Sequence, residues 1–212
     1  MKIAIISGSP RKSSKTIMVI NHAYNYLKNQ SHKLDVIDLA DKNIEMYCGF
    51  GVDYNQATKE MINKLTEADI WIIGTPVYNS FFSSAVKNVF EYINYKNTAG
   101  KIAGLIIVAS GHISFKSVQA NLTQLISYFG VITNPNPVYI TVDELDKNNQ
   151  LSKELRLRLE NVLDESIKLF EVNRWNHYKK GKFVHSSVAT TERNYAPLLI
   201  LRLRTLYCKI RV

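Results

Sequence analysis

Apolar and polar residues follow two different patterns along the chain. In some stretches branched apolar residues form short runs, as in Ile70-Trp71-Ile72-Ile73, and in others they recur every three or four positions. Runs of this kind predict strands, and the spaced positions predict amphipathic helices. We expect strands at residues 2–7, 34–39, 70–73 and 102–109, with a last one between 131 and 142. We expect helices at residues 15–29, 56–67, 83–95, 115–129 and 151–172.

The order of these segments indicates the fold class. Continuously apolar strands separated by helices are typical of a parallel sheet covered on both faces. Five strand–helix units fit one doubly wound α/β sheet. Because ligands of such sheets bind at the carboxyl ends of the strands, the loops after the first, third and fourth strands are the expected binding edge.

The loop after the first strand is rich in hydroxyl groups and opens a helix. It reads Ser7-Gly8-Ser9-Pro10-Arg11-Lys12-Ser13-Ser14-Lys15-Thr16. A helix N-terminus offers free backbone N–H groups and the positive end of the helix dipole. With hydroxyls and the Arg11 guanidinium added, the loop suits the phosphate of a mononucleotide. The spacing matches neither a Walker loop nor G-x-G-x-x-G. A Ser-rich N-cap on a surface helix is the alternative interpretation.

The two other loops carry groups that suit a planar heterocycle. Gly74-Thr75-Pro76-Val77-Tyr78-Asn79-Ser80 follows the third strand, which we expect Pro76 to end because proline has no N–H donor. Tyr78 supplies a flat apolar face, and Asn79 supplies a paired donor and acceptor. A plain turn with one core aromatic is the alternative. In Ala109-Ser110-Gly111-His112, after the fourth strand, glycine lets the backbone approach a ligand closely.

These loops resemble those of the NADPH-dependent FMN reductase family of flavodoxin-like proteins, which includes azoreductases, quinone reductases and chromate reductases. The residues that carry the resemblance are Gly8-Ser9-Pro10-Arg11 with Ser14 and Thr16, then Thr75-Pro76-Val77-Tyr78-Asn79, then Val86-Lys87-Asn88. The likeness covers about residues 1–170. It implies a flavodoxin-like five-stranded parallel sheet with helices on both faces.

The resemblance also implies an FMN site, assigned residue by residue. The phosphate would be held by the hydroxyls and cations of the first loop, namely Ser9, Arg11, Ser13, Ser14, Lys15 and Thr16. The isoalloxazine ring and ribityl chain would be lined by the second loop, namely Pro76, Val77, Tyr78, Asn79 and Ser80. The flavin edge would be covered by the third loop, namely Ser110, Gly111 and His112. No metal site is expected.

The implied activity is a ping-pong oxidoreduction. NADPH or NADH would pass a hydride to bound FMN and leave. A second acceptor, such as a quinone, an azo compound or free flavin, would then take the electrons. The flavin carries this chemistry, so no side chain needs to act as a nucleophile. Relatives are usually dimers or tetramers, which implies a homodimer or homotetramer.

Several positions depart from the family's pattern. Val77 stands where Glu is common, Ser83-Ser84-Ala85 replaces a Pro-Gly before the next helix, and Gly111 is the one glycine left of a usual pair. These changes spare the phosphate site. Phe81 and Phe82 make the rim apolar, which favours an aromatic or hydrophobic acceptor, or a subunit contact.

The positive charge is concentrated at the C-terminal end. Nine Lys and Arg side chains and one Glu fall in residues 173–212, so this stretch carries +8 of the net charge of +9. We therefore expect an FMN-binding domain over 1–172 and a basic extension over 173–212. The extension should be irregular at 176–194 and form an amphipathic helix at 198–212. That helix would dock on its own domain or a subunit partner, or contact a partner protein or an anionic membrane through 195–212. No recognition motif points to nucleic acid.

Two other functions stay open at this point. One is a flavodoxin-type electron carrier that does not turn over NADPH, and the other is a flavin-binding scaffold that acts through its basic tail. Two cysteines are too few for a disulfide framework. No apolar h-region follows the N-terminal Met-Lys, so a cytoplasmic location is expected.

Overall fold

A computed structural model describes residues 1–146 and 150–186, with side chains of the last helix described to residue 174. The chain divides into two units, Met1–Arg174 and Trp175–Val212. The strands are β1 (Lys2–Ser7), β2 (Lys33–Asp38), β3 (Ile70–Tyr78), β4 (Phe81–Phe82), β5 (Ile102–Ala109), β6 (Ile132–Thr133) and β7 (Val138–Thr141). The helices are α1 (Lys15–Leu27), α2 (Gln56–Glu67), α3 (Ser84–Glu91), α4 (Phe115–Tyr128) and α5 (Lys153–Ser186).

The first unit is built on a parallel sheet with the strand order β2-β1-β3-β5-β6. β7 also pairs with β5 in parallel, so β6 and β7 together fill the fifth position. This is the order of flavodoxin-like sheets, which reverses direction between β1 and β3. The predicted five-stranded, doubly wound fold is therefore confirmed.

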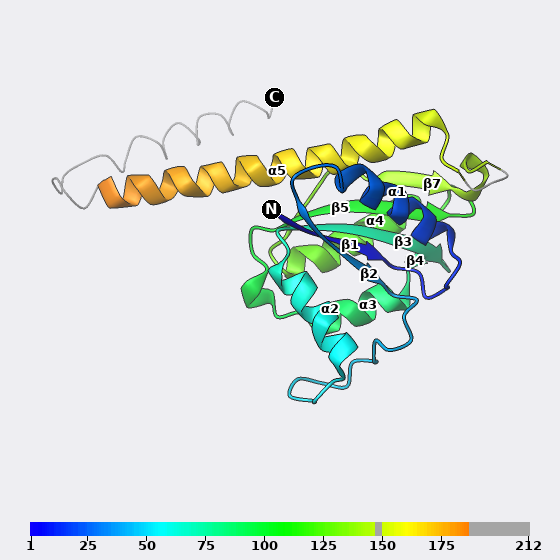
Figure 1. The fold of residues 1–212 in the computed structure, drawn as a ribbon, viewed down its shortest axis with the longest axis horizontal. Coiled ribbons are helices and arrows are strands. Elements are labelled where there is room, and N and C mark those ends of the chain that lie inside the picture. The colour runs from blue at the N-terminus through cyan, green and yellow to red at the C-terminus, as the bar shows by residue number, and fades with distance from the viewer. Residues whose placement is uncertain (147–149, 187–212) are drawn as a thin grey trace, which may run out of the picture. The chain divides into compact units, whose positions relative to one another are not determined.

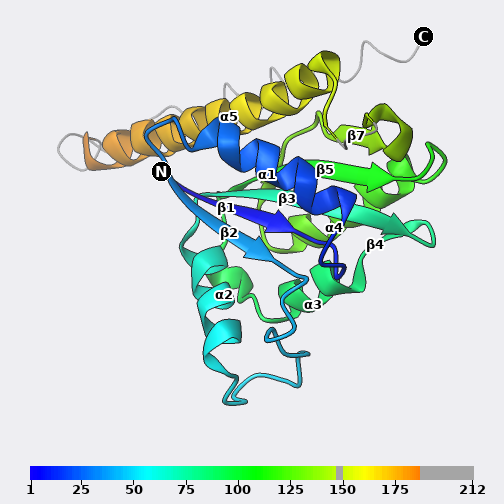
Figure 2. The same ribbon diagram turned by 45° about the vertical axis from the view of Figure 1, so that its right-hand side comes forward.

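Helices cover both faces of this sheet (Figures 1 and 2). Because side chains of a strand point alternately to the two faces, Ile3 and Ile5 join a core with α1 and α5. Ala4 and Ile6 join a second core with α2, α3 and α4. All four of these strand residues are at most 1% exposed, which explains why the strands are apolar throughout.

Two sequence predictions about strands are wrong. Pro76 does not end the third strand, since β3 continues to Tyr78 and pairs Pro76 with Val108 of β5. On its other side β1 stops at Ser7, opposite Gly74, so only one parallel neighbour needs bonds at Pro76. The last strand is split into β6 and β7, because Pro135 and Pro137 interrupt it.

The helix predictions need two corrections. α3 ends at Glu91 rather than 95, and residues 95–97 form a separate 3₁₀ turn. α5 continues past 172 to Ser186, so the predicted irregular stretch is helical over 176–186. The predicted helix at 198–212 and its contacts through 195–212 lie outside the described residues. The domain boundary after 172 stays a prediction. Within the described part of the chain, no helix is long and apolar enough to cross a bilayer.

Candidate functional site

A cavity of about 350 Å³ opens between the start of α1 and the carboxyl ends of β3 and β5. Figure 2 shows the start of α1 and the β3–β4 hairpin at the same edge of the sheet. Ten predicted site residues line this cavity: Ser9, Arg11, Ser13, Ser14, Lys15, Thr16, Pro76, Val77, Tyr78 and Ser110. Three lining residues were not predicted: Val108, Ala109 and Val142. The structure thus brings the three predicted loops together at one site.

The loop before α1 supplies the polar end of the cavity. Ser9 is fully buried, and its Oγ accepts a hydrogen bond from the Arg11 backbone N–H at 3.2 Å. Ser14 is the N-cap of α1, because its Oγ accepts from the Ile17 N–H at 3.1 Å. The first turn contains no acidic residue, so the positive end of the helix dipole is not compensated. The hydroxyl-bearing residues of this loop and the cations Arg11 and Lys15 therefore line one cavity.

Gly8 allows this loop to pack tightly against the neighbouring elements. Its N–H donates to the Gly74 carbonyl oxygen at 2.7 Å. A Cβ on Gly8 would lie 2.4 Å from Val86 Cγ2 and 2.5 Å from that same oxygen. The Ser83 hydroxyl donates to the Gly8 carbonyl and also accepts from the Val86 N–H, which caps α3. Glycine at this position is therefore required by space rather than by a ligand.

The β3–β4 hairpin forms the second side of the site. Asn79 and Ser80 have φ values of 48° and 64°, so both residues of this two-residue turn are left-handed, as type I′ hairpin turns require. Both side chains are exposed and lie outside the cavity lining. The Ser80 hydroxyl lies 2.8 Å from that of Ser114, which ties the hairpin to the loop before α4. The Tyr78 hydroxyl lies 3.4 Å from Ser9 Oγ.

The loop after β5 contributes less than predicted. Ser110 lines the cavity, but Gly111 and His112 are exposed and do not. The His112 ring makes an edge contact with Phe115 at 5.9 Å between centroids, so it packs on α4 in this structure. At the rim Phe81 is 46% exposed, whereas Phe82 is 4% exposed and belongs to the core. The prediction that both rings form an apolar rim is thus wrong for Phe82. For Phe81 it stays a prediction, because this ring is exposed but does not line the cavity.

The apolar end of the cavity is assembled by the sheet. Val108 and Ala109 end β5, next to Pro76 on β3. Val142 follows β7 and reaches the site because β7 pairs with β5. Val108 and Ala109 could have been predicted as lining residues, because they are the last residues of a predicted strand. Nothing local in the sequence marks Val142.

The lining chemistry fits FMN. Hydroxyls, two cations and a helix N-terminus match a phosphate at one end. Pro76, Val77, Tyr78 and Val108 match the apolar faces of a planar ring at the other. The individual contacts to FMN stay predictions.

Comparison with known proteins decides the family. Residues 1–144 match the model of the NADPH-dependent FMN reductase family. The chain belongs to this family. Among curated FMN reductase relatives, it is 25% identical over 189 residues to an NAD(P)H-dependent FAD/FMN reductase of Geobacillus thermodenitrificans, covering 87% of this chain and 100% of the relative. It is 24% identical over 189 residues to an FMN-dependent NADPH-azoreductase of Staphylococcus aureus, covering 84% and 100%.

A solved structure has a similar fold. The apo crystal structure of the NADH:FMN oxidoreductase EMOB matches with a TM-score of 0.68 at 20% identity. The match covers 78% of this chain and 87% of that chain. At this level of identity the likeness bears on the fold alone.

Proposed function

We propose that this chain is an FMN-dependent NAD(P)H oxidoreductase that reduces a second small-molecule acceptor in a ping-pong cycle. One observation carries the proposal. The cavity combines hydroxyls, two cations and an uncompensated helix N-terminus at one end with an apolar wall at the other. Membership of the NADPH-dependent FMN reductase family supports the same activity.

Each part of the cavity has a role in this proposal. When bound, FMN would supply the redox chemistry that links oxidation of NADPH or NADH to reduction of the acceptor. Arg11 and Lys15 would neutralise its phosphate, and Ser9 and Thr16 would donate hydroxyl hydrogen bonds to it. The wall of Pro76, Val77 and Val108 keeps water from one face of the ring.

The acceptor class follows from the rim and the relatives. Phe81 presents an exposed aromatic ring beside the site, next to the partly exposed Tyr78. Flat aromatic acceptors, such as quinones and azo compounds, suit such a rim. The azoreductase of S. aureus supports this class. We further propose a homodimer or homotetramer in the cytoplasm.

Anaerobic stopped-flow absorbance tests the proposal. The full chain is purified and loaded with FMN, and bleaching of its yellow colour is followed after mixing with NADPH or NADH. Menadione and methyl red are then added as acceptors. We expect one FMN per chain, bleaching by at least one nicotinamide, and reoxidation by an acceptor.

Two results would contradict the proposal. A flavodoxin-type carrier would bind FMN but would not be bleached by either nicotinamide at a rate above that of free FMN. A scaffold without a working cofactor site would stay colourless when FMN is added.

A further inference from the structure

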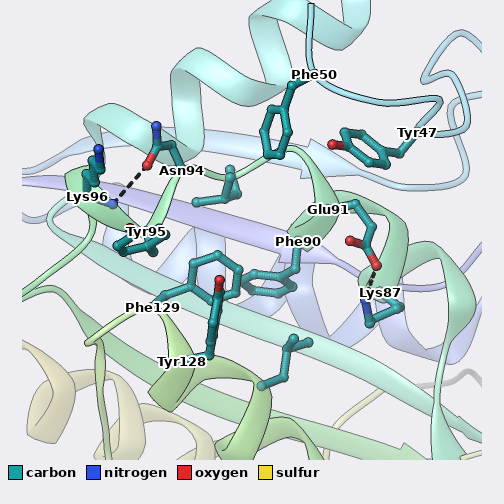
Figure 3. Close-up of a pocket in the computed structure, with 12 residues that line it drawn as sticks. Tyr47, Phe50, Lys87, Phe90, Glu91, Asn94, Tyr95, Lys96, Tyr128 and Phe129 are labelled. Atoms are coloured by element: carbon teal, nitrogen blue, oxygen red, sulfur yellow. Dashed lines mark hydrogen bonds and ion pairs between the residues drawn. The ribbon is translucent and has the colours of Figure 1, made fainter.

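A second and larger cavity lies away from the cofactor site. Its volume is about 590 Å³, and it shares no lining residue with the cavity at α1. Its walls come from three separate segments (Figure 3): the loop after β2, the end of α3 with the turn that follows, and the end of α4. α3 separates the two places, because its capping residue Ser83 contacts Gly8 while its last residue, Glu91, lines the second cavity.

The lining of this second cavity is rich in aromatic rings. They are Tyr47, Phe50, Phe90, Tyr95, Tyr128 and Phe129. Phe90 and Phe129 are 3% and 4% exposed and form the floor, with 5.5 Å between their ring centroids. Phe90 packs in turn against the fully buried Trp71. The floor is therefore part of the core and cannot collapse to close the hollow.

Hydrogen bonds hold the outer wall in place. The Asn88 side chain accepts from the Tyr47 N–H and donates to the Glu45 carbonyl, both at 2.9 Å. The Tyr92 hydroxyl donates to the same carbonyl at 2.6 Å. The Tyr54 hydroxyl accepts from the Cys48 N–H at 2.7 Å. The loop that carries Tyr47 and Phe50 is thus fixed to α3 by polar groups.

Charged groups stand at both ends of the cavity (Figure 3). Lys87 and Glu91 form an ion pair at one end and so neutralise each other. Lys96 lies at the other end, and its ammonium has no acidic partner among the described residues. The lining therefore carries one uncompensated positive charge beside exposed Tyr95 and Tyr128 rings, which are 52% and 69% exposed.

From this arrangement we propose that the cavity between α3 and α4 binds a planar aromatic anion at a site separate from the cofactor site. Ligand pockets commonly have volumes of about 300–1,000 Å³ and combine aromatic walls with a few placed polar groups. Aromatic rings stack on or meet the edges of a planar ligand. Lys96 supplies the counter-charge for a carboxylate or sulfonate. A bicyclic aromatic with one acidic group is the class that these features fit. This inference does not depend on the proposed reductase activity.

Equilibrium dialysis with naphthalene-2-sulfonate tests the site. The probe is dialysed against the full chain saturated with FMN, so that the cavity at α1 is filled. We expect one probe bound per chain. Lys96→Glu should weaken binding at least tenfold, and Tyr128→Ala at least fivefold. Lys153→Glu, an exposed lysine at the start of α5, is the matched control and should leave binding unchanged.

A second set of measurements locates the probe without relying on FMN. In the absence of FMN, Arg11→Ala should leave one probe bound, with an affinity that Lys96→Glu still lowers. Loss of binding in Arg11→Ala together with no effect of Lys96→Glu would put the probe in the α1 cavity and overturn the inference. Sedimentation velocity measures the assembly state and tests whether a second copy of the chain covers this face. If the probe does not bind at millimolar concentration, and Tyr128→Ala shifts the chain to a smaller assembly, this face is covered by a second copy and the inference is wrong.

Discussion

At the scale of single residues, the loops around the cavity contain positions where the local backbone restricts which residue can be accommodated. Gly8 is one, because a side chain there would overlap both Val86 and the Gly74 carbonyl. Ser80 is another, since its left-handed backbone conformation is unfavourable for a residue with a side chain. For each position, a substitution and a matched comparison variant test the effect on stability.

Gly8→Ala should lower the free energy of unfolding by about 2 kcal/mol, as overpacking does. It should also weaken FMN binding, because the loop must move to admit the methyl group. Gly111→Ala is the control for the effect on stability alone. Its Cβ would meet nothing within 4 Å, so the change should stay within about 0.5 kcal/mol. Urea unfolding and FMN titration measure both effects. Equal stability of the two variants would contradict the packing argument.

Ser80 has a left-handed backbone conformation, and its hydroxyl forms a hydrogen bond with that of Ser114. Ser80→Ala keeps the strained backbone and loses the bond, so it should destabilise the fold by about 1 kcal/mol. Ser80→Gly loses the same bond but also relieves the strain, by about 1 kcal/mol, and should be close to neutral. Thermal unfolding of the two variants gives the comparison. If Ser80→Gly were no more stable than Ser80→Ala, the turn would not be strained at this position.

At the scale of elements, the start of α1 and the loop after β2 each have a separable role. α1 is capped by Ser14 and lacks acidic residues in its first turn, which leaves its positive end for an anion. The loop after β2 is held on α3 by side-chain hydrogen bonds rather than by a strand. Both features can be tested by substituting an exposed side chain or by removing a single hydroxyl group.

Arg11→Ala should lower FMN affinity about ten- to a hundredfold, because a hydrogen bond to a charged group contributes about 1.5–3 kcal/mol. Lys12→Ala is the control, since Lys12 is exposed in the same loop but does not line the cavity. Fluorescence titration of FMN measures both affinities. An equal loss in the two variants would indicate general attraction by positive charge rather than a contact at Arg11.

Tyr92 links the stability of this loop to pH. Burial, with the nearby Tyr54, raises the pKa of Tyr92 from 10.0 to about 12. Because the folded state keeps the proton longer than the unfolded state, stability is unaffected by this group below pH 10 and falls as pH rises from 10 to 12. Tyr92→Phe should cost about 1 kcal/mol at pH 7 through the lost bond to Glu45 and should reduce that fall.

Urea unfolding between pH 7 and pH 12 checks the prediction for Tyr92. Tyr24→Phe serves as the control, since Tyr24 is 37% exposed on α1 and donates no hydrogen bond among the described residues. The same pH profile for Tyr92→Phe and the unaltered chain would contradict the assignment.

At the scale of the whole molecule, the first unit contains both cores and both cavities. A chain shortened to Met1–Arg174 should therefore keep its FMN affinity within twofold and its NADPH oxidation rate. Removal of the basic extension leaves the buried residues of α5, such as Leu159 and Leu163, in place. FMN titration and steady-state NADPH oxidation test this. Loss of folding or of FMN binding would show that residues 175–212 complete the core or the site.

The sequence by itself determined the fold class and named ten of the residues that line the cavity at α1. Strands apolar at every position, such as Ile70–Ile73, must be covered on both faces, and hydroxyl-rich loops after them need no long-range information to be recognised. Where β3 ends was decided by tertiary structure, because Pro76 is tolerated only where β1 has already stopped.

Only the tertiary structure brought distant segments together. Val142 reaches the cavity at α1 because β7 pairs with β5. The aromatic cavity joins Phe50, Tyr95 and Tyr128, which no local pattern relates. The physical reason is that hydrophobic periodicity records which face of an element is buried, whereas a cavity depends on which elements become neighbours and how far their side chains fall short of filling the space between them.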